Sequence, residues 1–173
     1  MIYRPAKLSD HEALSNLICA FRAEISRMRG YEASSSQEEA KREVKEELSQ
    51  ERFIIYVAEE ESLCGYAVFK DEDRTVWMEQ LYVAPDFRRQ GIARQFLAVG
   101  EALAESRGQE TLYFWVHPDN RGMLSFLRST GYDVLNLIEV RRKRNRETCP
   151  DEVRIFDATL FYGKGPIAKE AEL

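Results

Sequence analysis

Apolar side chains recur along the first half of the chain with two spacings, one typical of helices and one typical of strands. From Leu14 to Met28 they recur every three or four residues, as on the buried face of a helix. A thinner stripe of the same spacing follows Ser36 and predicts a second, very polar helix at the domain edge. Runs rich in β-branched and aromatic residues predict strands at 1–6, 53–58, 63–70 and 76–83, the second and third forming a hairpin.

The second half of the chain begins with a long helix and continues with shorter elements. A helix is predicted from Gln90 to about Arg107 and a shorter one at 120–130, each followed by a capping glycine. Further strands are predicted at 111–116, 132–142 and 152–162. The resulting order of strands and helices is that of a mixed α/β fold.

Composition and charge place the chain among soluble globular domains. It has 173 residues, of which 44% are hydrophobic and 32% charged, and we expect a single domain over 1–163 with a tail at 164–173. No apolar run approaches the ~20 residues of a membrane helix, so no membrane partner is expected. The three cysteines lie far apart and form no Cys-x-x-Cys pair, which supports neither a disulfide framework nor a metal site and favours the cytoplasm. The net charge of −5 disfavours a nucleic-acid partner.

The stretch from Glu79 to Arg94 carries the clearest chemistry. It begins as a strand that Pro85 ends, because proline has no N–H to donate. Gly91 lets the backbone approach a ligand closely, and the N–H groups at the following helix start attract anions. Three arginines, Arg88, Arg89 and Arg94, add positive charge at the same point. This stretch predicts a pyrophosphate cradle, the alternative being an ordinary strand-turn-helix with surface arginines.

The spacing Arg88-x-x-Gly91-x-Ala93 follows Leu81-Tyr82-Val83-x-Pro85, and this combination resembles the GNAT N-acetyltransferases. The resemblance implies a GNAT-like fold with a central, mostly antiparallel sheet of about six to seven strands and about four flanking helices. It also implies acetyl-coenzyme A as acyl donor, with the pantetheine arm pairing along Leu81, Tyr82 and Val83. The diphosphate would be held by Arg88, Arg89, Gln90, Gly91, Ile92, Ala93 and Arg94.

Two residues are candidate bases for removing the proton of an ammonium acceptor. Alternation along the strand places Glu79 on the face of Trp77, Leu81 and Val83, and the resemblance gives the matching glutamate a role as base acting through water. The alternative for Glu79 is a cross-strand charge pair. His117, expected at the end of the next strand, is the second candidate because imidazole titrates near neutral pH.

The family pattern continues into the helix predicted at 120–130. Asn120 matches it, and the resemblance implies a contact with the pantetheine; Met123 and Leu127 occupy further positions of the pattern. Leu127 stands where the family usually has a tyrosine that protonates the departing thiolate. Leucine cannot donate a proton, so water, Ser125 or another hydroxyl would have to serve, unless the enzyme needs no acid.

The resemblance therefore implies an N-acetyltransferase that moves an acetyl group directly to a primary amine of a small molecule or peptide. The alternative is a non-catalytic acyl-coenzyme A binding or regulatory module, which the missing tyrosine permits. The basic run at 141–146 is expected to be a solvated hairpin tip, the alternatives being a contact for an acidic partner or for the 3′-phosphate of the coenzyme. A homodimer is left open.

Overall fold

The computed structural model describes residues 1–31, 36–73, 75–143, 145 and 148–162. The chain divides into two compact units, one of Met1–Ala23 with Ser34–His117 and the other of Glu24–Ala33 with Pro118–Leu173. The tail expected at 164–173 lies outside the described residues.

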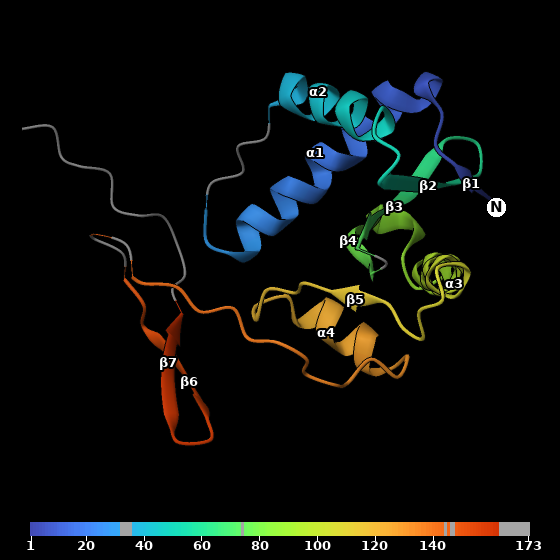
Figure 1. Cartoon of the computed structure of the whole chain (residues 1–173). Coiled ribbons are helices and arrows are strands. Elements are labelled where there is room, and N and C mark those ends of the chain that lie inside the picture. The colour runs from blue at the N-terminus through green and yellow to red at the C-terminus, as the bar shows by residue number, and fades with distance from the viewer. Residues whose placement is uncertain (32–35, 74, 144, 146–147, 163–173) are drawn as a thin grey trace, which may run out of the picture. The chain divides into compact units, whose positions relative to one another are not determined.

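A five-stranded mixed sheet organises the first unit, in the order β1-β2-β3-β4-β5 (Figure 1). The first four strands are antiparallel to their neighbours, whereas β5 runs parallel to β4. The hairpin and the strand that leads into the glycine loop are as predicted. The strands are β1 (Ile2–Pro5), β2 (Phe53–Glu59), β3 (Leu63–Glu72), β4 (Thr75–Val83) and β5 (Tyr113–Phe114).

Helices α1 (His11–Met28) and α2 (Gln37–Leu48) cover one face of this sheet (Figure 1). Their buried residues Leu14, Ile18, Ala40 and Val44 form one cluster with side chains from β2, β3 and β4. The helix α2 begins at a cap, because the Ser36 side chain accepts a hydrogen bond from the backbone N–H of Glu39. A short 3₁₀ turn, Leu8–Asp10, precedes α1.

Helix α3 (Ile92–Ser106) contacts β3 and β4 and is reached through a second 3₁₀ turn, Pro85–Phe87. It lies close to the strands because Gly100 has no side chain there: a Cβ at this position would lie 2.5 Å from the ring of Phe69 and 2.6 Å from Leu112. On the same side, the ring of Phe96 packs edge-on against Tyr3 of β1. The α3 helix is thus fixed against the sheet, and its N-terminus follows directly from the end of β4.

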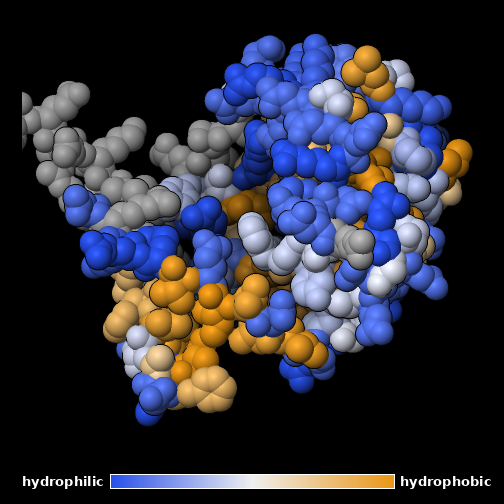
Figure 2. All heavy atoms as spheres, viewed as in Figure 1, coloured by the Kyte–Doolittle hydropathy of each residue, from blue (hydrophilic) through white to orange (hydrophobic). Residues whose placement is uncertain are grey.

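The second unit contains helix α4 (Arg121–Arg128) and a separate hairpin of β6 (Asp151–Ile155) and β7 (Ala158–Tyr162). Two predictions are wrong here. The segment predicted as a strand at 132–142 forms none, and the last predicted strand is instead this two-stranded hairpin. The seven strands of the described residues therefore form two sheets rather than one. The segment keeps its apolar side chains exposed, among them Val134, Leu135 and Leu137, and Figure 2 shows orange side chains gathered in this unit.

The described residues of the basic run do not follow a strand, because 132–142 forms none, so the expected hairpin tip is not seen there. Arg141, Arg142 and Lys143 are exposed, as expected for a solvated run, and the Arg141 guanidinium donates to the carbonyl of Arg142. Arg144 and Arg146 lie outside the described residues.

Candidate active site

A β-bulge at Glu79 sets the faces of β4. Phe69 pairs with Met78 and Val68 pairs with Gln80, so Glu79 is the extra residue on β4. Val68 belongs to the cluster beneath α1 and α2, and directly paired residues share a face, so Gln80 lies on that side. The bulge reverses the alternation beyond it. The prediction that Glu79 shares a face with Leu81 and Val83 is therefore wrong, whereas Glu79 and Trp77 do share one.

The edge of β4 opposite β3 presents backbone groups at Leu81 and Val83. The backbone N–H of Ala84 donates to the carbonyl of Cys64 at 2.8 Å, so these two residues form a hydrogen-bonded pair. Such pairs recur at every second residue, which turns the groups of Tyr82 toward β3 and those of Leu81 and Val83 away from it. Among the described residues, β5 pairs with β4 only at Trp77 and Met78 and does not reach this edge.

In the loop after β4, residues with a positive backbone φ alternate with a residue whose φ is not positive. Arg89 has a φ of 64° and Gly91 a φ of 86°, whereas Gln90 between them does not have a positive φ. Alternation of this kind turns successive N–H groups to one side and builds an anion-binding concavity. All four residues 88–91 are exposed. The Nε of Arg88 donates to the carbonyl oxygen of Val83 at 2.8 Å, which ties the loop to the end of β4.

Gly91 is the N-cap of α3, and no protein atom lies within 4 Å of where its Cβ would be. The first turn of the helix, which holds Ile92, Ala93 and Arg94, contains no acidic residue and receives no side-chain cap from Gly91. Its backbone N–H groups and the helix dipole therefore attract negative charge. Ile92 is buried and fixes this turn against the protein. The geometry fits a diphosphate that approaches the backbone at Gly91.

Glu79 lies in polar rather than apolar surroundings. Its side chain is 35% exposed, and its carboxylate lies 3.7 Å from the ammonium of Lys70 on β3. The cross-strand charge pair that the sequence left as an alternative is thus present, and it does not exclude a role in proton transfer. Lys70 also binds Glu72 at 2.9 Å. His117 is half-buried and lies three residues beyond the end of β5, not at the end of the strand.

Glu47 of α2 is a candidate that the sequence interpretation missed, because it assigned the charges of this helix to a solvated face. Its side chain is only 8% exposed, and its Oε2 has no hydrogen-bond partner among the described residues. The sequence does contain a sign of this burial. Glu47 stands three residues after Val44 and seven after Ala40, which places it on the apolar face of the helix. Burial, and then the negative charge of Glu79, raise the pKa of Glu47 to about 7, against the opposing effect of Arg22.

We expect this carboxylate to make the protein less stable as the pH rises from about 5 to 8. The folded pKa of about 7 exceeds the ordinary 4.5, so the folded state holds the proton longer than the unfolded state. The unfolding free energy therefore falls as pH rises through this window, by up to about 3 kcal/mol. Urea unfolding at pH 5 and pH 8 should show this loss in the wild type and in Glu46→Gln, but not in Glu47→Gln. An equal loss in Glu47→Gln would contradict it.

The three site residues predicted at 120–130 lie on or next to α4 in the second unit. Asn120 caps this helix, since its Oδ1 accepts the backbone N–H of Met123 at 3.1 Å. Met123 is half-buried, and Leu127 is 5% exposed and packs as a core residue. Asn120 thus has a structural role already, and its amide NH₂ group is a separate donor.

Neither a metal centre nor a membrane span is found in the described part of the chain. No group of three or more His, Cys, Asp or Glu side chains there could hold a metal ion. None of the described helices combines the length and the apolar character needed to cross a bilayer.

Comparison with known proteins relates this geometry to one family. Residues 19–132 match the family model described as "Acetyltransferase (GNAT) family". The mycothiol acetyltransferase of Geodermatophilus obscurus is 34% identical over 94 residues, which are 53% of this chain and 30% of that protein. The chain thus spans less than a third of this curated relative.

Solved structures share the fold at low identity. The aminoglycoside 6'-N-acetyltransferase AAC(6')-IG of Acinetobacter haemolyticus has a TM-score of 0.65 and 18% identity, covering 83% of this chain and 99% of its own. AAC(6')-Iy in complex with the bisubstrate analog CoA-S-monomethyl-acetylneamine has a TM-score of 0.66 and 18% identity. The match covers 83% of this chain and 97% of that chain. A transcriptional regulator of Bacillus halodurans has a TM-score of 0.62 at 18% identity. The match covers 82% of this chain and 99% of that chain.

The family model covers well over half of the chain and includes β4, the glycine loop and α3. This chain belongs to the GNAT acetyltransferase family.

Proposed function

We propose that this protein is an N-acetyltransferase that moves the acetyl group of acetyl-coenzyme A directly to a primary amine. One observation carries the proposal. The open edge of β4 at Leu81 and Val83 is followed, after a short 3₁₀ turn, by a loop in which Arg89 and Gly91 have positive φ, and this loop ends at the start of α3, which has no side-chain cap. An extended pantetheine arm followed by a diphosphate needs these two features in this order.

Different parts of the site bind the coenzyme and carry out the proton transfer. Backbone N–H groups from Arg88 to Arg94 hold the diphosphate, with the arginine side chains adding charge. The N–H groups on the outer edge of β4 hold the pantetheine amides and polarise the thioester carbonyl, as an oxyanion hole does. Glu79 or His117 accepts the proton of the acceptor ammonium. The amine nitrogen then forms the new C–N bond, the C–S bond breaks, and the coenzyme leaves as a thiolate.

The rival function is a non-catalytic acyl-coenzyme A binding module. A panel of amines, including an aminoglycoside because similar folds are found in aminoglycoside N-acetyltransferases, separates the two when assayed for free thiol release. We expect one or more amines to accelerate release far above the rate without acceptor. Tight binding of acetyl-coenzyme A with no release across the panel would favour the module.

We place the protein in the cytoplasm, where acetyl-coenzyme A is available. Among the described residues, Cys19, Cys64 and Cys149 form no disulfide, which supports this placement because disulfides are rare in that compartment.

Leu127→Tyr should not raise turnover, because we propose that solvent or a hydroxyl such as that of Ser125 protonates the thiolate. The larger side chain must enter a buried site, which costs about 1–3 kcal/mol of unfolding free energy. Leu124 on the same helix is 43% exposed, so Leu124→Tyr is the matched control and should leave stability nearly unchanged. Steady-state rates and melting temperatures of both variants check this. A large gain in turnover for Leu127→Tyr at unchanged stability would mean that the position needs an acid.

A further inference from the structure

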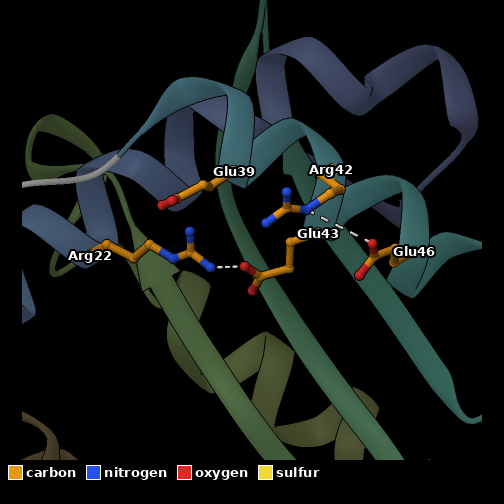
Figure 3. Close-up of a pocket in the computed structure, with 5 residues that line it drawn as sticks. All are labelled: Arg22, Glu39, Arg42, Glu43 and Glu46. Atoms are coloured by element: carbon orange, nitrogen blue, oxygen red, sulfur yellow. Dashed lines mark ion pairs between the residues drawn. The ribbon is translucent and has the colours of Figure 1, made fainter.

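A chain of polar side chains runs from the sheet to the surface between α1 and α2. The hydroxyl of Tyr66 donates to Oε1 of Gln80 at 2.8 Å, and the amide of Gln80 donates to Oε1 of Glu43 at 3.3 Å. Glu43 forms an ion pair with Arg22 of α1, and Figure 3 shows the two side chains facing each other in a surface pocket. Every polar group named here has a partner within the chain.

Glu47 lies one helical turn after Glu43 on the same side of α2 and has no comparable partner. It is more than nine-tenths buried, and its Oε2 receives no hydrogen bond from the described residues. The hydroxyl of Tyr66 acts on Glu47 electrostatically but donates to Gln80 instead. A buried carboxylate oxygen without a hydrogen bond destabilises the fold. A purely structural role therefore does not explain why a glutamate stands at this position.

The groups that act on Glu47 come from three neighbouring elements and from α2 itself. They are Arg22 of α1, Tyr66 of β3 and Glu79 of β4, and on its own helix Glu43 lies one turn before it and forms an ion pair with Arg22. Burial and the charge of Glu79 both favour the protonated form of Glu47, and Arg22 opposes them. The negative charge of Glu79 thus adds to burial in raising the pKa of Glu47 toward neutral pH.

The bulge connects this pair to the edge of β4. It places Glu79 on the face covered by α1 and α2, two residues before Leu81, whose backbone groups point to the open edge. Glu79, whose charge acts on Glu47, therefore lies beside the part of β4 where the thioester is proposed to lie.

We propose that Glu47 is the second carboxylate of the acceptor site, where it binds the acceptor ammonium together with Glu79 and takes its proton. This inference rests on the proposed acetyl transfer. The N–H proton moves to the carboxylate pair of Glu47 and Glu79, the nitrogen forms its bond to the acetyl carbon, and the C–S bond breaks to release the thiolate. The proton then passes from this pair to solvent. The site selects amines that are cationic in solution over neutral ones.

The test compares Glu47→Gln with Glu46→Gln, the same change at the next residue, whose side chain is 64% exposed and pairs with Arg42. We measure kcat/KM for the best amine of the panel from pH 6 to 10 and the affinity for acetyl-coenzyme A by calorimetry. Glu46→Gln should behave as wild type. Glu47→Gln should keep its coenzyme affinity, lose about 10²-fold in kcat/KM and lose the inflection near neutral pH.

A second readout needs no turnover. Carbon-detected NMR of the glutamate carboxyls should show one group that titrates near pH 7 in the wild type, is absent in Glu47→Gln and titrates lower in Glu79→Gln. An active wild type with a Glu47→Gln variant of unchanged pH profile would overturn this inference alone. A wild type that acetylates no amine would overturn the proposed function and this inference with it.

Discussion

Gly91→Glu should abolish acetyl-coenzyme A binding while the protein remains folded. The new carboxylate would stand at the N-terminus of α3, where we place the diphosphate, and like charges in contact cost several kcal/mol. This loss corresponds to at least about 100-fold in affinity. Gly91 has a φ of 86° and open space around its Cβ position, so the substitution strains the backbone by about 1–2 kcal/mol without a steric clash. Calorimetric titration with acetyl-coenzyme A measures the effect.

Two variants separate charge from strain. Gly108 follows the other end of α3, with a φ of 74° and equally open surroundings, so Gly108→Glu adds the same charge and strain about 25 Å away. Gly91→Ala keeps the strain at the loop but adds no charge. Both should bind acetyl-coenzyme A far more tightly than Gly91→Glu does. Equal affinities of Gly91→Glu and Gly108→Glu would show that the diphosphate lies elsewhere.

Glu79→Gln should lower kcat/KM for a protonated amine by about 10²–10⁴-fold near neutral pH. An alkylamine has a pKa of ~10, so only about one molecule in a thousand is unprotonated at pH 7 and a base is needed. The defect should shrink above pH 9, where the free amine becomes abundant. Rates measured from pH 6 to 10 with one acceptor would show this convergence.

Glu72 provides the matched control for Glu79. Both carboxylates lie near the ammonium of Lys70, at 2.9 Å from Glu72 and 3.7 Å from Glu79. Glu72→Gln therefore removes a charge pair with Lys70 without altering β4, and it should leave turnover unchanged. If Glu79→Gln keeps the wild-type pH–rate profile, the base is Glu47, His117 or water, and Glu47→Gln and His117→Gln become the informative variants.

The sequence predicted the elements that are determined locally. The hairpin of β2 and β3, the end of β4 at Pro85 and the helix behind Gly91 all follow from side-chain spacing and from backbone-restricting residues. The loop could be recognised because glycine and the arginines stand at fixed distances in the chain. The bounds of these elements differ from the predicted ones by one or two residues, as at the start of α3, which is Ile92 rather than Gln90.

The features that the sequence did not predict are those that depend on which other segment a strand or helix packs against. The bulge at Glu79 is a property of the register between β3 and β4, and alternation within one strand cannot reveal it. The burial of Glu47 could not be established from the acidic helix alone, because it depends on the strands that pack beneath that helix. The segment at 132–142 has the side chains of a strand, but a strand also needs a neighbour to pair with, and no strand ladder forms there among the described residues.

The central claim is direct transfer of the acetyl group to an amine, and acetyl-coenzyme A labelled in its acetyl carbonyl tests it in a single measurement. We predict that the label appears in an amide of the acceptor, with one labelled amide for each free coenzyme thiol released. Thiol release with the label recovered only as acetate, or label retained in intact acetyl-coenzyme A despite binding, would contradict the claim.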